Sequence, residues 1–355
     1  MQNIAKILKN KRTEFKYKLK EVSTILNIDI AIVSKLERGE RKVTKKQILA
    51  FIDFYALNKK EILITWLSEK IYEEIKDEKY NLDALYLAEE KLKTLSMTKD
   101  KPLLNPEIIA LLTKIDFYKE KLRKKSLVEG DDFLEYKEKN YLKYTYQSNR
   151  IHGNSLSLEE TELVVLEGQT IVGKSMHEHL EAINHYDTIE FIKEVIEFKK
   201  PFTEKLIKEI HYSILKGIDR KNAGKYRKTD TIIKGSKFKP PQADLIVKKI
   251  ENVVSFYNNN KESIHPVILA AEIHEKIYST QAFLTGNGRL ARFIMNYILL
   301  KNGYQFIIIK GIPKNKKFYH KALEKIQLKN ETKDFHLLIC NLVLELYEEF
   351  SEKIL

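Results

Sequence analysis

The chain has 355 residues, of which 43% are hydrophobic and 32% charged, and its net charge is +13. This length predicts two or three domains. Without a signal-peptide pattern or a membrane-length apolar run, we expect a cytoplasmic protein with no membrane span. The single cysteine, Cys340, excludes an intramolecular disulfide, and the apolar residues around it predict a buried structural thiol.

The positive charge is concentrated at the N-terminus. Residues 1–70 contain 16 Lys and Arg against 8 Asp and Glu, so this fifth of the chain carries +8. Such a bias favours a polyanionic partner. The alternative is a lysine-rich composition that solvates every surface, and the basic bias elsewhere leaves both interpretations open.

Residues 1–70 have apolar positions at helical spacing, which predicts four or five short helices. Val22–Leu26, a turn at Asn27–Ile28, and a helix from Asp29 to Arg38 have the proportions of a helix-turn-helix. Asp29 is expected to cap the second helix, because its carboxylate can accept from the free N–H groups.

The same region contains Ser34-Lys35-Leu36-Glu37-Arg38-Gly39, which matches the signature S-x-x-E-x-G. Residues 1–70 therefore resemble the Cro/repressor (XRE) family of helix-turn-helix domains, which implies a DNA-binding transcriptional regulator that acts as a homodimer. The usual early glutamine is absent and two base-facing positions are apolar, so a small bundle for protein contacts is the alternative. The candidate DNA contacts are Lys18, Lys20, Asp29, Ile30, Ser34, Lys35, Arg38 and Arg41.

Helical spacing continues beyond residue 70. We expect a helical connector and linker over 71–106, a large helical domain over 107–330, and a last helix over 331–355 packed on it. The chain's one tryptophan, Trp66, lies in a segment expected to connect or dimerise. Thr229–Phe238, with Lys234-Gly235 at its centre, predicts a β-hairpin. The predicted fold class is mainly α: a five-helix helix-turn-helix domain, a helical linker and an all-α domain with one β-hairpin flap.

The large domain contains Gly286-Asn287-Gly288-Arg289-Leu290-Ala291-Arg292, a glycine-rich turn that runs into a helix. Backbone N–H groups of such a turn can point at one anion, and the helix N-terminus adds positive potential. Arg289 and Arg292 share a helical face and can hold phosphate oxygens in bidentate fashion.

This stretch resembles the Fic motif H-x-F-x-D/E-G-N-G-R-x-x-R. Fic proteins mostly transfer AMP from ATP to a target hydroxyl. The resemblance extends to residues 148–156, which are similar to the family's inhibitory helix, and to the flap that holds a target segment. It implies an all-α Fic fold over 107–330. The implied phosphate and nucleoside contacts are Gly286, Asn287, Gly288, Arg289, Arg292 and Asn296; the implied inhibitory motif is Ser148, His152, Gly153 and Asn154; the implied target flap is Thr231, Ile232, Ile233, Lys234 and Gly235.

Three positions depart from the family pattern. Gln281 stands at the catalytic histidine, and an amide cannot accept the proton of the attacking hydroxyl, a loss worth about 10²–10⁴ in rate. Thr285 stands at the metal-binding acid and is a poor Mg²⁺ ligand. His152 stands where the inhibitory glutamate pairs with the second arginine. We therefore expect no intact catalytic residue and no metal site.

Three functions follow, in descending preference. The first is a DNA-binding regulator whose Fic domain is a pseudoenzyme that binds a nucleotide or phosphate ligand. The second is an active Fic-type nucleotidyl or phosphate-group transferase that modifies protein hydroxyls by altered chemistry. The third is a protein-interaction scaffold. No cofactor is definite: ATP or another nucleotide is a candidate, with Mg²⁺ weak or absent. The expected partners are DNA through residues 1–70, a phosphate ligand in the loop, a peptide or protein at the flap, and a second copy of the chain, but no membrane.

Overall fold

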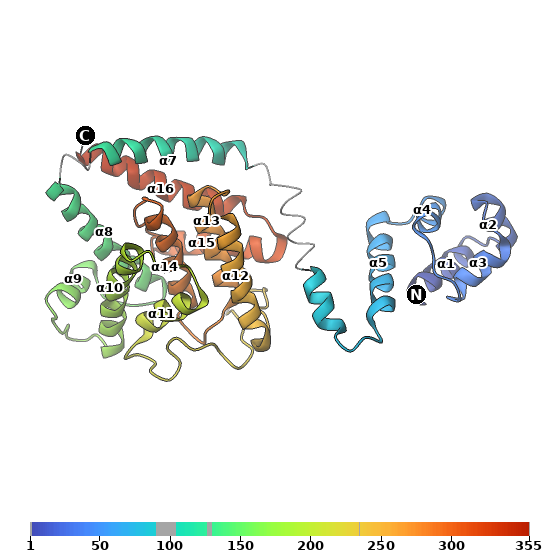
Figure 1. Ribbon diagram of the computed structural model, residues 1–355, viewed down its shortest axis with the longest axis horizontal. Coiled ribbons are helices and arrows are strands. Elements are labelled where there is room, and N and C mark those ends of the chain that lie inside the picture. Colours follow the sequence, from blue (N-terminus) through green and yellow to red (C-terminus); the bar gives the residue numbers. More distant parts are fainter. Residues whose placement is uncertain (1, 90–103, 126–129, 234, 355) are drawn as a thin grey trace. The chain divides into compact units, whose positions relative to one another are not determined.

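The computed structural model describes residues 2–89, 104–125, 130–233 and 235–354. It divides into two compact units, Met1–Leu103 and Leu104–Leu355 (Figure 1). Within those described ranges the regular structure is helical and no strand is formed, which confirms a mainly α fold. No helix in the same ranges is long and apolar enough to cross a membrane. The predicted connector over 71–106 falls partly outside the described residues, and its boundaries stay predictions.

The first unit is built from short helices whose apolar residues meet in one core. Asp29 caps the third helix, as expected, since its carboxylate accepts from the N–H groups of Ala31 and Ile32. The core includes Val22, Leu36 and Phe51, all fully buried. The helices are α1 (Gln2–Glu14), α2 (Leu19–Leu26), α3 (Ile30–Glu37), α4 (Lys45–Phe54) and α5 (Lys59–Ile75).

The S-x-x-E-x-G signature, which begins in α3 and ends at Gly39, has a structural explanation. The Glu37 carboxylate is buried and holds Arg12 of α1 in a two-pronged ion pair, with Nε to Oε1 at 2.7 Å and Nη2 to Oε2 at 2.9 Å. Arg12 also donates to the Tyr17 carbonyl. Gly39 follows α3 with φ of 74°, a left-handed conformation that favours glycine. The signature therefore fixes how α1 and α3 pack.

Trp66 belongs to this same core. Its side chain is buried, and its indole N–H donates to the Val43 carbonyl at 2.8 Å. α5 consequently packs on α1 and α4 through its first turns and is part of the first unit.

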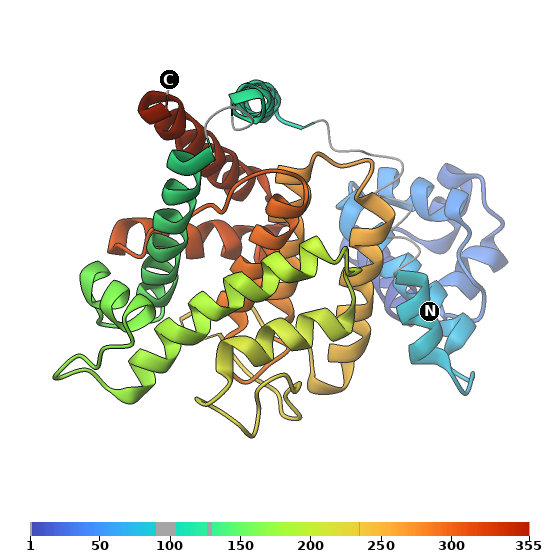
Figure 2. The ribbon, with the colours of Figure 1, turned by 60° about the vertical axis from the view of Figure 1, so that its left-hand side comes forward.

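The second unit surrounds one central helix. α14 lies in the middle of the unit and packs against α13, α11 and α10, while α7 and α16 run side by side on one flank (Figures 1 and 2). The helices are α7 (Pro106–Lys125), α8 (Gly130–Ile151), α9 (Leu158–Leu166), α10 (Met176–Glu197), α11 (Glu204–Leu215), the short 3₁₀ helix η1 (Ala243–Leu245), α12 (Ile246–Asn260), α13 (Pro266–Thr280), α14 (Asn287–Lys301), α15 (Pro313–Lys329) and α16 (Lys333–Ile354).

The central helix α14 is buried on every side from Asn287 to Leu299. A helix in such a place is expected to be apolar all round, yet α14 carries Arg289, Arg292 and Asn296. These three polar residues are spaced i, i+3 and i+7, so they form one stripe. A buried polar group is costly unless it is hydrogen-bonded or paired. A polar group of this stripe that has no partner within the protein would therefore mark a place where a ligand can bind.

The predicted β-hairpin at Thr229–Phe238 is wrong. Its described residues form no strand, because side chains rather than a second strand satisfy its backbone. Arg227 donates to the carbonyls of Thr229 and Pro241, at 2.8 and 2.6 Å. At the other end, the Glu324 carboxylate accepts from the backbone N–H of Lys237. The segment is an extended loop held by two anchors.

Candidate anion-binding site

The glycine-rich turn joins α13 to the central helix α14. α13 ends at Gln281, a non-glycine residue with φ of 44°, and α14 follows Gly286 with φ of 77°. The Asn287 side chain closes the turn: its oxygen accepts from Phe283 N–H, and its amide donates to the Phe283 carbonyl. Asn287 thus shapes the loop with its side chain, which leaves only its backbone N–H for a ligand.

His211 of α11 packs against the turn and is hydrogen-bonded to it. The Gly224 N–H donates to its Nδ1 at 3.0 Å, so Nε2 carries the proton and donates to the Thr285 carbonyl at 3.0 Å. The ring stacks on Phe283 with centroids 3.6 Å apart. Burial lowers the pKa of His211 to about 4, which keeps it neutral near pH 7. His211 is a positioning residue that the sequence gave no reason to select.

Arg292 is the most unusual group of the site. Its side chain is 1% exposed, and it donates through Nε and Nη2 to the Ser148 hydroxyl and through Nη2 to the Ser148 carbonyl, at 2.9–3.0 Å. Among the described residues, Nη1 has no hydrogen-bond partner and no carboxylate pairs with this guanidinium. A buried cation that has no counter-charge and a free donor strongly favours the binding of an anion.

Arg289 differs, because it already has a counter-charge. Its Nη1 donates to Glu181 of α10 at 2.8 Å, and both side chains are nearly buried. Burial lowers the pKa of Arg289, and the Glu181 carboxylate opposes that shift. Its Nε is buried without a partner among the described residues. Glu181 therefore orients Arg289 and leaves one donor unused.

The predicted inhibitory motif lies against this pair of arginines. Ser148 holds Arg292, as described, and Asn154 donates to Glu181 at 3.0 Å. His152 is solvent-exposed at the end of α8, and Gly153 follows it with φ of 98°. These residues surround the arginines from the α8 side, and the imidazole of His152 stands where a carboxylate could have neutralised Arg292.

Gln281 and Thr285 are the two positions of the loop that are expected to lack catalytic function. The Gln281 amide donates to the Tyr278 carbonyl at 2.6 Å, so its nitrogen faces the end of α13. The Gln281 carbonyl accepts from Arg227 at 2.7 Å. Thr285 is exposed. Neither side chain offers a titratable base.

Asn296, which is expected to reach a nucleoside, is hydrogen-bonded within the core in this structure. Asn296 is fully buried, its amide donates to the Ile307 carbonyl, and its oxygen accepts from the Ile307 N–H. Both ends of the side chain are used within the core, so Asn296 anchors the segment after α14.

Of the predicted flap residues, Ile232 is 82% exposed, Gly235 is exposed, and Thr231 and Ile233 are half-buried. Lys234 lies outside the described residues. Arg227, which the sequence did not single out as a site residue, links the flap to the loop: its side chain holds both ends of the flap, and its N–H donates to the Ala282 carbonyl.

The predicted DNA-contacting residues lie on α2, α3 and the turns beside them. Ser34 is half-buried and the other seven are exposed. Asp29 is used as the cap of α3, and Arg38 pairs with Glu40 at 2.9 Å. The remaining exposed basic side chains of this set are Lys18, Lys20, Lys35 and Arg41.

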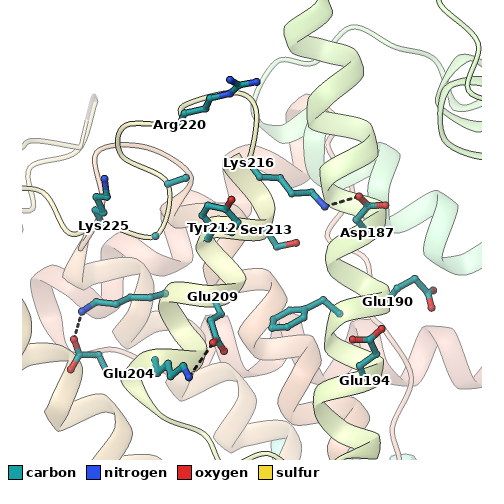
Figure 3. A pocket seen from close by; sticks show the side chains of 15 residues that line it. Asp187, Glu190, Glu194, Glu204, Glu209, Tyr212, Ser213, Lys216, Arg220 and Lys225 are labelled. Atoms are coloured by element: carbon teal, nitrogen blue, oxygen red, sulfur yellow. Dashed lines mark hydrogen bonds and ion pairs between the residues drawn. The ribbon is translucent and has the colours of Figure 1, made fainter.

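The second unit also has an open groove of about 1130 Å³ between α10 and α11 (Figure 3). It contains both acidic and basic side chains, several of them paired, such as Lys216 with Asp187 at 2.8 Å. None of the residues Gly286 to Arg292 lines it. The groove is separate from the arginine site, and its mixed charge does not select an anion.

The comparisons with known proteins agree with this geometry. Residues 201–299, which run from α11 into α14, match the model of the Fic/DOC family. This chain contains a Fic domain.

The chain is 31% identical to the protein adenylyltransferase Fic of Aedes aegypti over 194 residues, 54% of this chain and 37% of that protein. It is also 31% identical to the protein adenylyltransferase Fic of Drosophila grimshawi, over 52% of this chain and 38% of that protein. The match therefore spans less than two fifths of these relatives.

Two solved structures share the fold. Fic-1 of C. elegans (residues 134–508) gives a TM-score of 0.64 at 18% identity, covering 100% of this chain and 99% of that one. A Fic-domain-containing signaling protein of Bacteroides thetaiotaomicron gives 0.62 at 24% identity, covering 66% and 94%.

Proposed function

We propose that this chain is a DNA-binding regulator whose Fic domain binds a nucleotide or another phosphate ligand without transferring it. The observation that carries the ligand-binding part is Arg292, a buried guanidinium with no carboxylate partner and a free Nη1 among the described residues. An anion is the group that would satisfy both its charge and its donor.

The start of α14 adds donors beside that guanidinium. Its first helical bond runs from the Leu290 N–H to the Gly286 carbonyl. The N–H groups of Asn287, Gly288 and Arg289 therefore precede the internal bonds of the helix. With the positive end of the helix dipole, they form a phosphate cradle of the kind found at other helix N-termini.

Binding without transfer follows from what stands beside the cradle. The Gln281 amide has no basic lone pair near neutral pH, and His211 is neutral with both ring nitrogens in use. The phosphate-holding groups are retained, whereas the groups that would activate a hydroxyl are not.

The regulatory part of the proposal rests on the first unit. Its α2 and α3 are joined by a tight turn at Asn27, and Lys18, Lys20, Lys35 and Arg41 are exposed around them. Such cations contact DNA phosphates, which give affinity without reading bases. Homodimerisation is part of this proposal, because two copies would contact two half-sites.

Calorimetric titration with ATP tests the ligand-binding part. We expect wild type to bind, and Arg292→Met to lose at least about a hundredfold in affinity, as for a buried charged hydrogen bond. Arg220→Met is the matched control, since Arg220 is exposed and lies in the α10–α11 groove. Equal binding by all three proteins, or no binding by any, would reject the proposal.

DNA binding is tested by the salt dependence of affinity for a duplex of random sequence. Each phosphate contact contributes about −0.9 to the slope of log K against log salt. Lys35→Ala should make the slope shallower by about one, whereas Lys60→Ala, an exposed lysine on α5, should leave it unchanged. No measurable affinity at low salt would rule out this part alone.

An active transferase is the second candidate, favoured by the names of the relatives, which are protein adenylyltransferases. Incubation with labelled ATP and lysate separates it from the first. We expect wild type to leave no label and Gln281→His/Thr285→Asp to gain it, by about 10²–10⁴ in rate. Labelling by wild type that disappears in Arg289→Met would favour the transferase.

A further inference from the structure

The groove between α10 and α11, which is separate from the arginine site, has walls that are fixed by short contacts. The Asn184 amide of α10 donates to the Lys216 carbonyl, just after α11, at 2.6 Å. The loop that follows then returns onto α11. At Gly224, a Cβ would lie 3.1 Å from the Lys208 carbonyl oxygen and 3.2 Å from the Tyr212 Cβ. The groove is therefore formed before anything binds in it.

The size and the middle of the groove suit a polypeptide segment. Its volume of about 1130 Å³ exceeds the range of about 300–1,000 Å³ that is usual for small-molecule pockets, and it is open rather than enclosed. Phe191 of α10, Tyr212 of α11 and Ala223 of the loop supply apolar surface along it. The Tyr212 side chain is 55% exposed. An apolar face of a partner could cover this surface.

The charged side chains that line the groove are sorted toward its two ends. Arg220 and Lys225, on the loop after α11, lie toward one end, whereas Glu190 and Glu194 of α10 lie toward the other (Figure 3). Glu190 pairs with Lys193 of its own helix at 3.0 Å. Glu194, Arg220 and Lys225 have no ion pair among the described residues. The groove thus has a negative end and a positive end, each with a charge that is not compensated.

We propose that this groove binds an amphipathic α-helix of a partner protein. A third helix that lies between two adjacent helices packs as helices do in a bundle, with its apolar face on Phe191 and Tyr212. Its first turn carries a basic side chain that meets Glu194, and its last turn carries a carboxylate that meets Arg220. The helix dipole favours the same direction, because the positive N-terminus faces the carboxylates and the negative C-terminus faces the cations.

The apolar and charged contacts have different roles in this interface. Exposed ion pairs contribute little affinity, so the apolar face holds the helix in the groove. The charges at the two ends disfavour the reversed helix, because that direction would place like charges together. A preference for one direction of charge is therefore the property that identifies the site.

Two synthetic peptides of about 18 residues, long enough to be helical, test this property by fluorescence anisotropy with the full chain. Both have the same leucine stripe. The first has lysines in its first turn and glutamates in its last, and the second has these two sets exchanged. Wild type should bind the first peptide at least about tenfold more tightly than the second.

A charge-reversed groove should invert that preference. The variant Glu190→Lys/Glu194→Lys/Arg220→Glu/Lys225→Glu changes four exposed side chains, so its fold should be retained, and it should bind the second peptide more tightly. The matched control is Lys248→Glu/Glu251→Lys, which reverses a surface ion pair on α12 outside the groove. It should keep the preference of wild type.

The apolar contact has its own pair of variants. Tyr212→Ala should weaken the binding of both peptides by about tenfold. Phe117→Ala, which removes an aromatic ring that is 66% exposed on α7, should change neither affinity.

Three results would overturn the proposal: equal affinity of wild type for the two peptides, an unchanged preference in the charge-reversed variant, or no binding of either peptide at about 1 mM. Sedimentation of the protein alone tests the other occupant. If wild type forms a dimer and the charge-reversed variant is a monomer, the groove holds a second copy of the chain, and the partner helix is wrong.

Discussion

Each unit of this protein packs an arginine between its helices, and the two arginines differ in how their charge is compensated. In the first unit, Arg12 meets the Glu37 carboxylate through two nitrogens. In the second, Arg292 is more deeply buried and donates to the hydroxyl and carbonyl of Ser148, and no carboxylate pairs with it among the described residues. The charge of Arg12 is compensated within the fold, so Arg12 is structural. The charge of Arg292 is left for something outside the chain.

The units also differ in their histidines. All nine lie in the second unit, and His185, His211 and His274 are at most 1% exposed. Burial lowers the pKa of each, to about 4 for His211 and well below the ordinary value for the other two. These three histidines are therefore protonated near pH 6.5 in the unfolded chain but stay neutral at that pH in the folded unit.

The largest expected effect follows from this difference. As pH falls from 6.5 towards 5, the second unit should lose about 1.4 kcal/mol of unfolding free energy per pH unit for each such histidine, and the stability should be restored above pH 6.5. The first unit should change little. Denaturant unfolding can separate them, since Trp66 fluorescence reports only on the first unit and circular dichroism at 222 nm mainly on the second. Parallel losses by both probes would contradict the difference.

The next effect concerns the paired arginine. Glu37→Ala should destabilise the first unit by about 3 kcal/mol, because it removes the buried carboxylate and leaves the half-buried Arg12 without its counter-charge. Trp66 fluorescence measures the loss. Glu40→Ala, which removes a carboxylate from an exposed pair with Arg38, is the control and should cost under about 1 kcal/mol. If the two variants lose the same amount, burial of the Arg12 pair is not what stabilises α1 on α3.

A smaller effect is expected when a paired arginine loses its counter-charge and so comes to resemble Arg292. Glu181→Gln keeps a hydrogen-bond acceptor for Arg289 but removes its counter-charge. Affinity for ATP should rise by about tenfold, while the ligand-free unit becomes less stable. Glu194→Gln, an exposed change on the same helix, should alter neither quantity. Weaker ATP binding by Glu181→Gln would mean that the carboxylate serves the ligand rather than competing with it.

Much of the fold could be predicted from the sequence, because helical periodicity and caps such as Asp29 are local signals. The loop from Gly286 to Arg292 was equally local, since the donors and the helix that carries them are contiguous. Arg289 and Glu181, in contrast, are 108 residues apart, and no local pattern pairs them. The same holds for His211 beneath Thr285.

The missing β-hairpin and the hydrogen bonds of Asn296 have physical reasons of the same kind. The Thr and Ile residues near Thr229 have high β-propensity, but a strand also needs a partner ladder, and Arg227 takes the carbonyls instead. Asn296 lies on the right face of α14 for a ligand, yet the Ile307 backbone satisfies it first. Competition from distant backbone groups is not visible in a single stretch of sequence.

The central claim is that Arg292 is kept for an anion at some cost to the fold. Thermal unfolding of the second unit in wild type and Arg292→Met, with and without ATP, tests it directly. Without ligand, the variant should be as stable as wild type or more stable, because an uncompensated buried cation is removed. With ATP at about a hundred times its dissociation constant, only wild type should gain about 2.7 kcal/mol. A variant that is strongly destabilised without ligand, beside a wild type that ATP does not stabilise, would show that Arg292 is as structural as Arg12.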